Sequence, residues 1–195
     1  MSDLPITREE AINLLKGMPQ LDSDTNHYLE TEAIMRGLAG HFGEDIEYWG
    51  ILGLLHDIDW ALTRDDWSEH CIKAVELLKE KGFDDEFIEN VQSHGYGYDE
   101  IPLLKDKKRT SKIQHCLVAA ETLTGIIHAY ALIKGKRISD MDAKGLKKKF
   151  KDRKFAANCN RELVEEIELT GLSMDDLFIL SIESIKKIKD QIGLE

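Results

Sequence analysis

The strongest chemical signal in the sequence is the adjacent pair His56-Asp57, which follows the apolar segment at residues 46–55. Burying an imidazole or a carboxylate is costly unless the group finds a partner. A divalent metal ion would satisfy both side chains, because neutral imidazole and carboxylate are common ligands of zinc, iron, manganese and nickel. Taken alone, the dipeptide favours a simpler interpretation, a helix-capping histidine followed by an aspartate that starts the next turn.

Three further histidines lie on the inward faces of separate predicted helices. His27 continues the apolar stripe that contains Thr31, His70 stands four residues before Ala74, and His94 lies at the start of a glycine-rich loop. Each of them alone is more typical of a hydrogen-bonded histidine in a core or at a helix end. Together with the buried pair they favour a metal site built from side chains that face one another across a helical bundle.

A carboxylate late in the chain would complete such a site, and Glu121 is the candidate. It stands four residues after Leu117 and therefore borders the buried stripe of a long predicted helix, with His128 seven residues further along the same edge. The alternative for Glu121 is a carboxylate that faces solvent. Asp59 is a candidate for orienting a ligand histidine from outside the site, and a helix N-cap is an equally good interpretation.

The elements that must position these residues are expected to be helical throughout. Apolar residues recur at intervals of three and four, and no alternation of apolar and polar residues persists over five positions. A capping-box pair, Thr7 and Glu10, opens the first helix, and Gly43 ends the second. The predicted helices span about residues 7–16, 25–42, 46–55, 66–82, 84–93, 110–134, 139–150, 162–169 and 173–188.

The order of the candidate residues resembles the HD superfamily of metal-dependent phosphohydrolases. The resemblance rests on His27, then His56-Asp57, then His70 and His94, then an acidic residue in Ala-Ala-Glu121-Thr-Leu, and it covers about residues 25–130. It implies an all-α fold, an HD-domain-like helical bundle with additional C-terminal helices. Residues 1–134 would form the metal-binding core, and residues 135–195 would form an extension packed on it in one globular unit.

The resemblance also implies the ligands. One or two divalent ions (Mn, Fe, Zn, Ni, Co or Mg) would be held by His27, His56, Asp57 and Glu121. His70 and His94 match extra histidines that bind a second metal or the phosphate in some branches. Glu121 stands where the family usually has aspartate, and its side chain is one methylene longer.

The activity that the resemblance implies is hydrolysis of a phosphate ester, in a nucleotide or another small molecule, by metal-activated water. Asp57 would be the ligand nearest to the attacking water and would accept its proton, with Asp59 in support. The candidate phosphate-binding cations are Arg64, Lys73, Arg109 and Lys112. Each of these four is more typical of a solvated surface charge.

Two other classes of function stay open at this stage. One is an oxygenase-like enzyme with two iron ions on the same fold, and the other is a helical regulatory or binding protein with a vestigial site. Either enzyme is expected to bind a metal ion or to be stimulated by one, whereas the regulatory or binding protein is not. Released phosphate, as opposed to oxygen consumption, separates the two enzymes.

Composition and charge limit the kinds of partner that the protein is expected to bind. The formal charge of −11 argues against DNA as a partner. Residues 144–154 carry seven basic residues and one acid, a run that suits RNA or polyphosphate but is more typical of a solvated helix face. The sequence predicts a cytoplasmic protein without a membrane partner. Its three cysteines are scattered, it lacks a signal-peptide pattern, and its apolar runs are expected to be too short for a bilayer. A homo-oligomer is left open.

Overall fold

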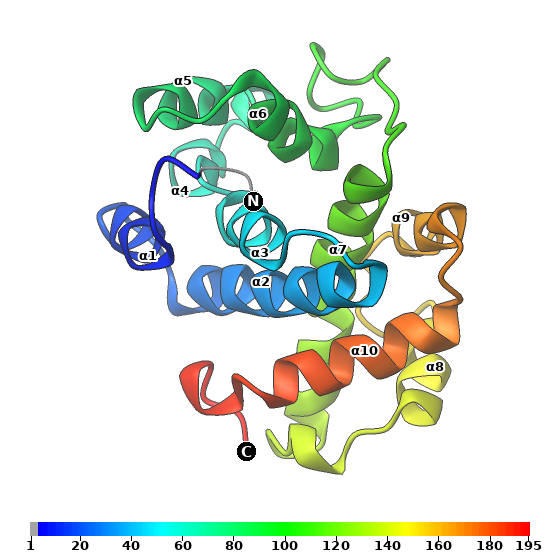
Figure 1. Ribbon diagram of the computed structural model, residues 1–195. Helices are drawn as coiled ribbons and strands as arrows, with labels where there is room; N and C mark the ends of the chain where they lie inside the picture. The colour runs from blue at the N-terminus through cyan, green and yellow to red at the C-terminus, as the bar shows by residue number, and fades with distance from the viewer. Residues whose placement is uncertain (1–3) are drawn as a thin grey trace.

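The computed structural model describes residues 4–195, and this part of the chain contains helices and loops but no strand. Two long helices form its centre, α2 (Asp22–Phe42) and α7 (Lys112–Ile133). Helix α3 (Ile46–Leu55) packs on α2, and α10 (Met174–Lys186) packs on another side of α2 (Figure 1). Helix α7 crosses this layer and contacts both α2 and α3, so it joins the elements that carry the candidate ligands.

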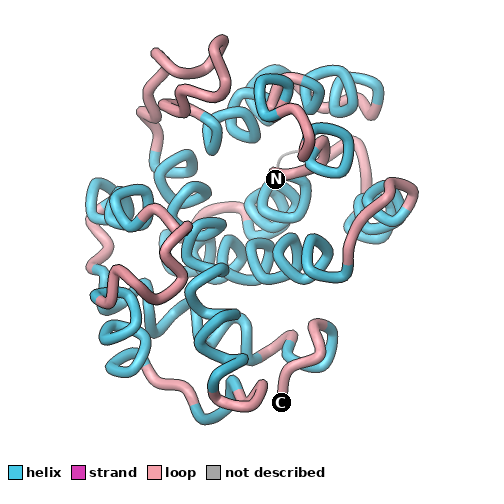
Figure 2. The backbone as a smooth tube through the Cα atoms, turned by 180° about the vertical axis from the view of Figure 1, so that it is seen from behind, coloured by secondary structure: helices cyan, strands magenta, loops and turns pink. Residues whose placement is uncertain are grey.

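Shorter helices surround this centre, and loops connect them on the outside (Figure 2). Six are α-helical: α1 (Arg8–Lys16), α4 (Trp60–Thr63), α5 (Lys73–Glu80), α6 (Asp85–Gln92), α8 (Ala143–Lys151) and α9 (Arg161–Glu165). The others are short 3-10 helices: η1 (Trp67–Glu69), η2 (Ser93–Gly95), η3 (Ile138–Asp140), η4 (Glu166–Thr170) and η5 (Lys189–Gln191).

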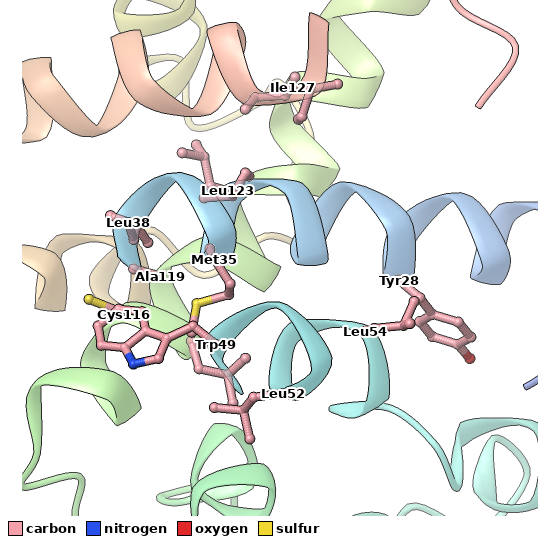
Figure 3. Close-up of a cluster of buried hydrophobic side chains, with 14 of the residues drawn as sticks. Tyr28, Met35, Leu38, Trp49, Leu52, Leu54, Cys116, Ala119, Leu123 and Ile127 are labelled. Atoms are coloured by element: carbon pink, nitrogen blue, oxygen red, sulfur yellow. The ribbon is translucent and has the colours of Figure 1, made fainter. Parts of the chain in front are cut away.

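The core follows from the apolar stripes of the central helices. Met35 and Leu38 of α2 are fully buried, and they lie among side chains of α3 and α7 such as Leu52 and Leu123 (Figure 3). The same continuous cluster includes Leu177 and other residues of α10. The predicted division of the chain at residues 134 and 135 is therefore not accompanied by a break in the apolar core, and that division stays a prediction.

Several helix ends are where their capping residues predict them. Thr7 and Glu10 form both hydrogen bonds of a capping box at the start of α1, as predicted. Gly43 ends α2 in the left-handed conformation (φ 71°), and Ser173 caps α10 by accepting a hydrogen bond from the backbone N–H of Asp176. Helix α2 begins at Asp22, three residues before the predicted start, within error typical of helix boundaries.

The helix predicted over residues 66–82 is wrong as a continuous element. The short turn η1 is followed by His70 in extended conformation (φ −64°, ψ 139°) and by Cys71 in the left-handed region (φ 64°), and α5 begins only at Lys73. This break turns the side chain of His70 toward Asp59. The prediction over residues 139–150 also fails as a single helix, because Asp142 caps a new helix, α8, after η3.

Helix α7 corrects the expectation that no apolar run is long enough for a bilayer. By length and composition alone this helix could cross a membrane, but 67% of its most apolar 18-residue stretch is buried inside the fold. A central core helix passes the same test. The burial in contact with α2, α8 and α9 accounts for its apolar character without a membrane.

A glycine sets the distance between α2 and α3. A Cβ atom on Gly53 would lie 2.9 Å from Cγ of Met35 and 3.0 Å from the backbone oxygen of Thr31. Only a residue without a side chain allows the two helices to approach this closely. The approach matters for the site, because α2 carries His27 and α3 ends at His56.

Candidate metal centre

Asp57 lies between four histidines that come from four separate segments. Its Oδ2 is 3.6 Å from Nε2 of His27 on α2 and 3.6 Å from Nε2 of His56, the residue that ends α3. Its Oδ1 is 3.4 Å from Nε2 of His70 and 3.1 Å from Nε2 of His94 in η2. The carboxylate therefore faces one histidine pair with each oxygen.

The outer ring nitrogens of two histidines are fixed by backbone carbonyl groups. Nδ1 of His56 lies 2.8 Å from the carbonyl oxygen of Gly53, and Nδ1 of His94 lies 2.6 Å from that of Val91. A carbonyl oxygen can only accept, so Nδ1 must be the donor in both rings. In the neutral imidazole, Nε2 then carries a lone pair, and that lone pair points into the centre.

The other two histidines have side-chain partners that act in the same way. Nδ1 of His70 lies 3.0 Å from Oδ1 of Asp59, a buried carboxylate whose other oxygen accepts the backbone N–H of Ala74. Nδ1 of His27 lies 2.8 Å from Oγ1 of Thr124. Because that hydroxyl donates to the backbone oxygen of Glu121 (2.6 Å), it accepts from His27. In the neutral form of these rings, Nε2 is the inward acceptor as well.

The inward nitrogens are close enough to repel one another unless a cation lies among them. Nε2 of His27 and Nε2 of His56 are 3.0 Å apart, and Nε2 of His70 and Nε2 of His94 are 3.2 Å apart. Lone pairs of neutral imidazoles at such distances, together with two carboxylate oxygens, need a positive charge. This donor set fits a divalent ion that accepts nitrogen and oxygen ligands. The described residues form two groups whose ligand atoms lie close enough together to hold one ion each, one with His27 and His56 and the other with His70 and His94.

Electrostatics put His56 and Asp57 in the protonation states that a metal requires, and they keep a proton on His70. Burial lowers the pKa of His56 to about 3, so this ring is neutral at pH 7. Burial alone would raise the pKa of Asp57, but the surrounding histidines, His56 first, hold it well below its usual value. At His70, burial opposes the charged form, but the hydrogen bond with Asp59 outweighs it and raises the pKa to about 10. Metal binding at His70 therefore displaces a proton.

Glu121 lies beside this cluster. It is half-buried and lines a cavity of about 150 Å³ together with Asp57, His70 and His94. Its carboxylate accepts a hydrogen bond from the Thr122 hydroxyl. Burial raises the pKa of Glu121, and the attraction of nearby histidines only partly offsets this effect. The structure thus brings His27, His56 and Asp57 into direct contact and places Glu121 at the rim of the same centre.

Three of the four candidate phosphate-binding cations lie away from this cavity. Lys112 forms an ion pair with Glu44 (3.0 Å), and Arg64 donates to the backbone oxygen of Pro19 (2.6 Å). Lys73 is exposed on α5. The described residues that line the cavity include none of the three.

Arg109, the fourth cation, holds the loop that follows His94. Its guanidinium donates to the carbonyl oxygens of Ser93 (2.8 Å) and Tyr96 (2.9 Å) and forms a two-pronged ion pair with Glu166 (2.7 and 2.8 Å). All of these bonds are internal to the fold. Arg109 therefore fixes the backbone around His94.

This ion pair leads to a prediction on pH and stability. Burial raises the pKa of Glu166, but hydrogen bonds from Arg109 and His115 outweigh it and leave the pKa below the usual value. A carboxyl group whose pKa is lower in the folded protein than in the unfolded chain stabilises the fold above about pH 4.5. This contribution is lost as the pH falls through the folded-state pKa. We expect Glu166→Gln to lower the free energy of unfolding by about 1–3 kcal/mol at pH 7.

The measurement is urea-induced unfolding of the wild type and the variant between pH 7 and pH 3.5. The difference between the two proteins should shrink below about pH 4.5, where the Glu166 carboxylate of the unfolded wild type takes up protons that the folded one does not yet bind. The exposed neighbour provides the control, Glu165→Gln, for which no such difference is expected. A difference that stays constant, or grows toward low pH, would contradict this account of the ion pair.

Sequence reasoning did not find several residues of the site. The cavity walls include Trp60, Trp67 and Tyr98, and the Trp60 and Trp67 rings meet edge to face with centroids 5.5 Å apart. Cys71 lies against His94, and Thr124 orients His27. The adjacency of Cys71 to His70 was the available signal for the thiol. The aromatic walls depend on tertiary contacts and have no local signature.

Asp59 supports a second prediction, which concerns metal affinity. Asparagine at this position offers one acceptor oxygen for the two N–H groups that the carboxylate now binds, and it removes the charge that orients His70. Loss of such a supporting group typically costs roughly 10- to 100-fold in metal affinity. We expect Asp59→Asn to weaken metal binding to this extent, measured by competition with a chromophoric chelator. The exposed residue Asp65 provides the control, Asp65→Asn, and equal affinities for both variants would rule out a positioning role.

The fold and the donor set together define a class, an all-helical protein with a buried histidine-carboxylate metal site. A family model described as HD domain matches residues 25–126, which is just over half of the chain. The chain therefore belongs to the HD superfamily of metal-dependent phosphohydrolases, and the resemblance seen in the sequence is confirmed.

Curated relatives of the chain include ribonuclease Y from several bacteria. The ribonuclease Y of Sulfurovum sp. is 26% identical over 174 residues, which cover 85% of this chain and 32% of that protein. The ribonuclease Y of Listeria welshimeri is 33% identical over 99 residues, which cover 51% of this chain and 17% of that protein. The chain thus spans about a third or less of the length of these relatives. No solved structure matches the chain.

Proposed function

We propose that this protein hydrolyses phosphate esters with the help of divalent metal ions bound around Asp57. The observation that carries the proposal is the convergence of four imidazole Nε2 lone pairs on the two oxygens of one carboxylate. His27, His56 and Asp57 hold one ion, His70 and His94 hold a second ion or the phosphate, and Glu121 completes the set at the rim. Membership in the HD superfamily supports this chemistry.

Divalent ions at such a centre supply an activated water near neutral pH and neutralise the charge that develops on the phosphoryl oxygens. The side chains of the protein itself orient the attacking water and take up its proton. Asp57 has a low pKa and is therefore a weak base, so it contributes as a ligand and as a hydrogen-bond acceptor for the attacking water. Glu121, whose pKa is raised by burial, is better matched to accept the proton of that water.

The substrate that the cavity favours is a small phosphate ester with a planar group. A volume of about 150 Å³ holds a phosphoryl group and part of its alcohol. Trp60, Trp67 and Tyr98 provide aromatic walls on that side, and aromatic faces stack well on nucleobases. A nucleotide-like substrate is therefore the one we propose first. The cytoplasmic location expected from the sequence is a separate proposal that the cavity does not bear on.

A second candidate is the phosphodiester bond of RNA. The name ribonuclease Y of the relatives favours it, as does the basic run at residues 144–154, of which α8 is the main part. The net charge of −11 opposes it, because phosphate contacts must overcome repulsion by the rest of the surface. A short single-stranded RNA that contacts only one basic face would limit that repulsion.

The experiment compares substrates on one metal-free preparation reloaded with Mn, Fe, Zn, Ni, Co or Mg. The substrates are p-nitrophenyl phosphate, bis-p-nitrophenyl phosphate, mononucleotides, cyclic nucleotides and an end-labelled short RNA. We expect metal-dependent hydrolysis that His56→Ala abolishes, that Glu121→Ala weakens and that a change at the exposed His41, His41→Ala, leaves intact. The proposal fails if loaded protein releases no product from any substrate. Oxygen consumption would then favour the oxygenase-like alternative, and absence of bound metal would favour a binding protein.

A further inference from the structure

A thiol joins the histidine pair on one side of the centre. Cys71 is fully buried, and its Sγ lies 3.5 Å from Nε2 of His94. Donor atoms of His70, Cys71 and His94 all lie within 4.8 Å of one another. Within residues 4–195, the opposite pair, His27 and His56, has Asp57 as its third close donor. The two sides of Asp57 therefore differ in chemistry.

Two of the spacings match those of ligands around one four-coordinate ion. Zinc binds imidazole nitrogen at about 2.0–2.1 Å and thiolate sulfur at about 2.3 Å, so tetrahedral geometry puts two nitrogens about 3.3 Å apart and a nitrogen and a sulfur about 3.5 Å apart. The structure has 3.2 Å between Nε2 of His70 and Nε2 of His94, and 3.5 Å between Nε2 of His94 and Sγ of Cys71. Oδ1 of Asp57 lies 3.1 Å from the same nitrogen of His94. Sγ of Cys71 also lies 3.9 Å from Nδ1 of His94, so the thiol stands beside the ring and must rotate toward Nε2 to share an ion with it.

The backbone around Cys71 holds the thiol in this place. Cys71 has a left-handed backbone (φ 64°), which is uncommon for a residue with a side chain, and its carbonyl oxygen accepts a hydrogen bond from Gln92 (3.1 Å). A Cβ atom on Gly95 would lie 2.7 Å from Sγ, so the glycine leaves the space that the sulfur occupies. Tyr96 and Ile101 belong to a small apolar cluster with Cys71 and keep water from that side.

We propose that Cys71 is a thiolate ligand of the ion held by His70 and His94, and that this half of the centre selects a thiophilic ion such as zinc or iron(II). Magnesium and manganese prefer oxygen ligands, so they suit the half formed by His27, His56 and Asp57 better. Binding replaces the thiol proton with the ion, and the proton is released to solvent. This inference rests on the metal-binding part of the proposed function and makes no assumption about the substrate.

The test is a cobalt(II) titration of the metal-free protein without oxygen, followed by absorption spectroscopy. A thiolate ligand gives a sulfur-to-cobalt charge-transfer band in the near ultraviolet, whereas nitrogen and oxygen ligands give only the weaker visible bands. We expect the near-ultraviolet band to saturate at one cobalt ion per chain. In Cys71→Ser we expect the band to disappear while the visible bands remain, and zinc affinity to fall at least about tenfold with manganese affinity unchanged.

Two other cysteines provide matched controls. Cys116 is buried in the main core, and Cys159 lies against Gly125, so Cys116→Ser and Cys159→Ser should keep the band. Visible bands without the near-ultraviolet band in the wild type would overturn the role of Cys71 and leave the metal centre and the proposed function standing. A band that persists in Cys71→Ser would also overturn it. Absence of any cobalt binding would overturn both. The wild-type spectrum decides the question even if Cys71→Ser does not fold.

Discussion

Replacing Asp57 with asparagine is expected to cause one of the largest losses of function of any single substitution in this protein, comparable with that of His56→Ala. Each carboxylate oxygen faces one histidine pair, so both halves of the centre lose their shared ligand and its negative charge. Substitutions of groups outside the ligand shell typically cost roughly 10- to 100-fold, and a ligand shared by two ions should cost more. We expect kcat/KM to fall more than about 100-fold, together with most of the bound metal.

The measurement combines elemental analysis of the purified variant with kinetics on the best substrate of the panel. Asparagine has the size of aspartate, so circular dichroism of Asp57→Asn should match that of the wild type. Asp65→Asn, an exposed change of the same type, should keep both metal and activity. Full metal content in Asp57→Asn would show that Asp57 does not bridge the two histidine pairs.

The second large effect is expected at Gly53, where a side chain would force α2 and α3 apart. A Cβ atom at this position meets two backbone atoms, the oxygen of Thr31 at 3.0 Å and Cα of Glu32 at 3.1 Å, and neither can move without the helix. Overpacking of a filled core typically costs about 1–3 kcal/mol, and more where the backbone must move. We expect Gly53→Val to lower the free energy of unfolding by about 3 kcal/mol or more.

The same substitution should weaken metal binding, because α2 carries His27, α3 ends at His56, and the Gly53 carbonyl orients His56. Urea unfolding of metal-free protein measures the packing cost, and a chelator competition measures the effect on the site. Gly40 on α2 provides the matched control, since a Cβ there has no neighbour within 4 Å. Gly40→Ala should be neutral or stabilise by up to about 1 kcal/mol. Wild-type stability in Gly53→Val would show that the helices are not held as closely as described.

The sequence predicted the central helices well because their apolar spacing directly reflects the buried face. Helix α3 begins and ends where the apolar run does, and Gly43 marks the end of α2. The break between η1 and α5 could not be predicted in the same way. Nothing local distinguishes a cysteine that adopts a left-handed backbone, as Cys71 does, from one inside a helix.

For the site, the sequence supplied the residue types and their order but not their arrangement. His27, His56, Asp57, His70 and His94 were all candidates, and the structure brings them together. Their division into two pairs around Asp57, and the carbonyl and hydroxyl partners that orient them, are tertiary features. The cations illustrate what the sequence could not show: Arg109 was a candidate for phosphate binding, and its ion-pair partner Glu166 lies far away in the sequence. A role in phosphate binding stays a prediction.

The measurement that tests the central claim most directly is anomalous X-ray diffraction from crystals of protein reloaded with zinc and manganese. The account predicts two ion peaks on either side of Asp57, one against His27 and His56 and the other against His70 and His94, with the zinc signal concentrated in the second. Density for ions only at the acidic surface, with the four imidazoles left uncoordinated in fully loaded protein, would contradict it.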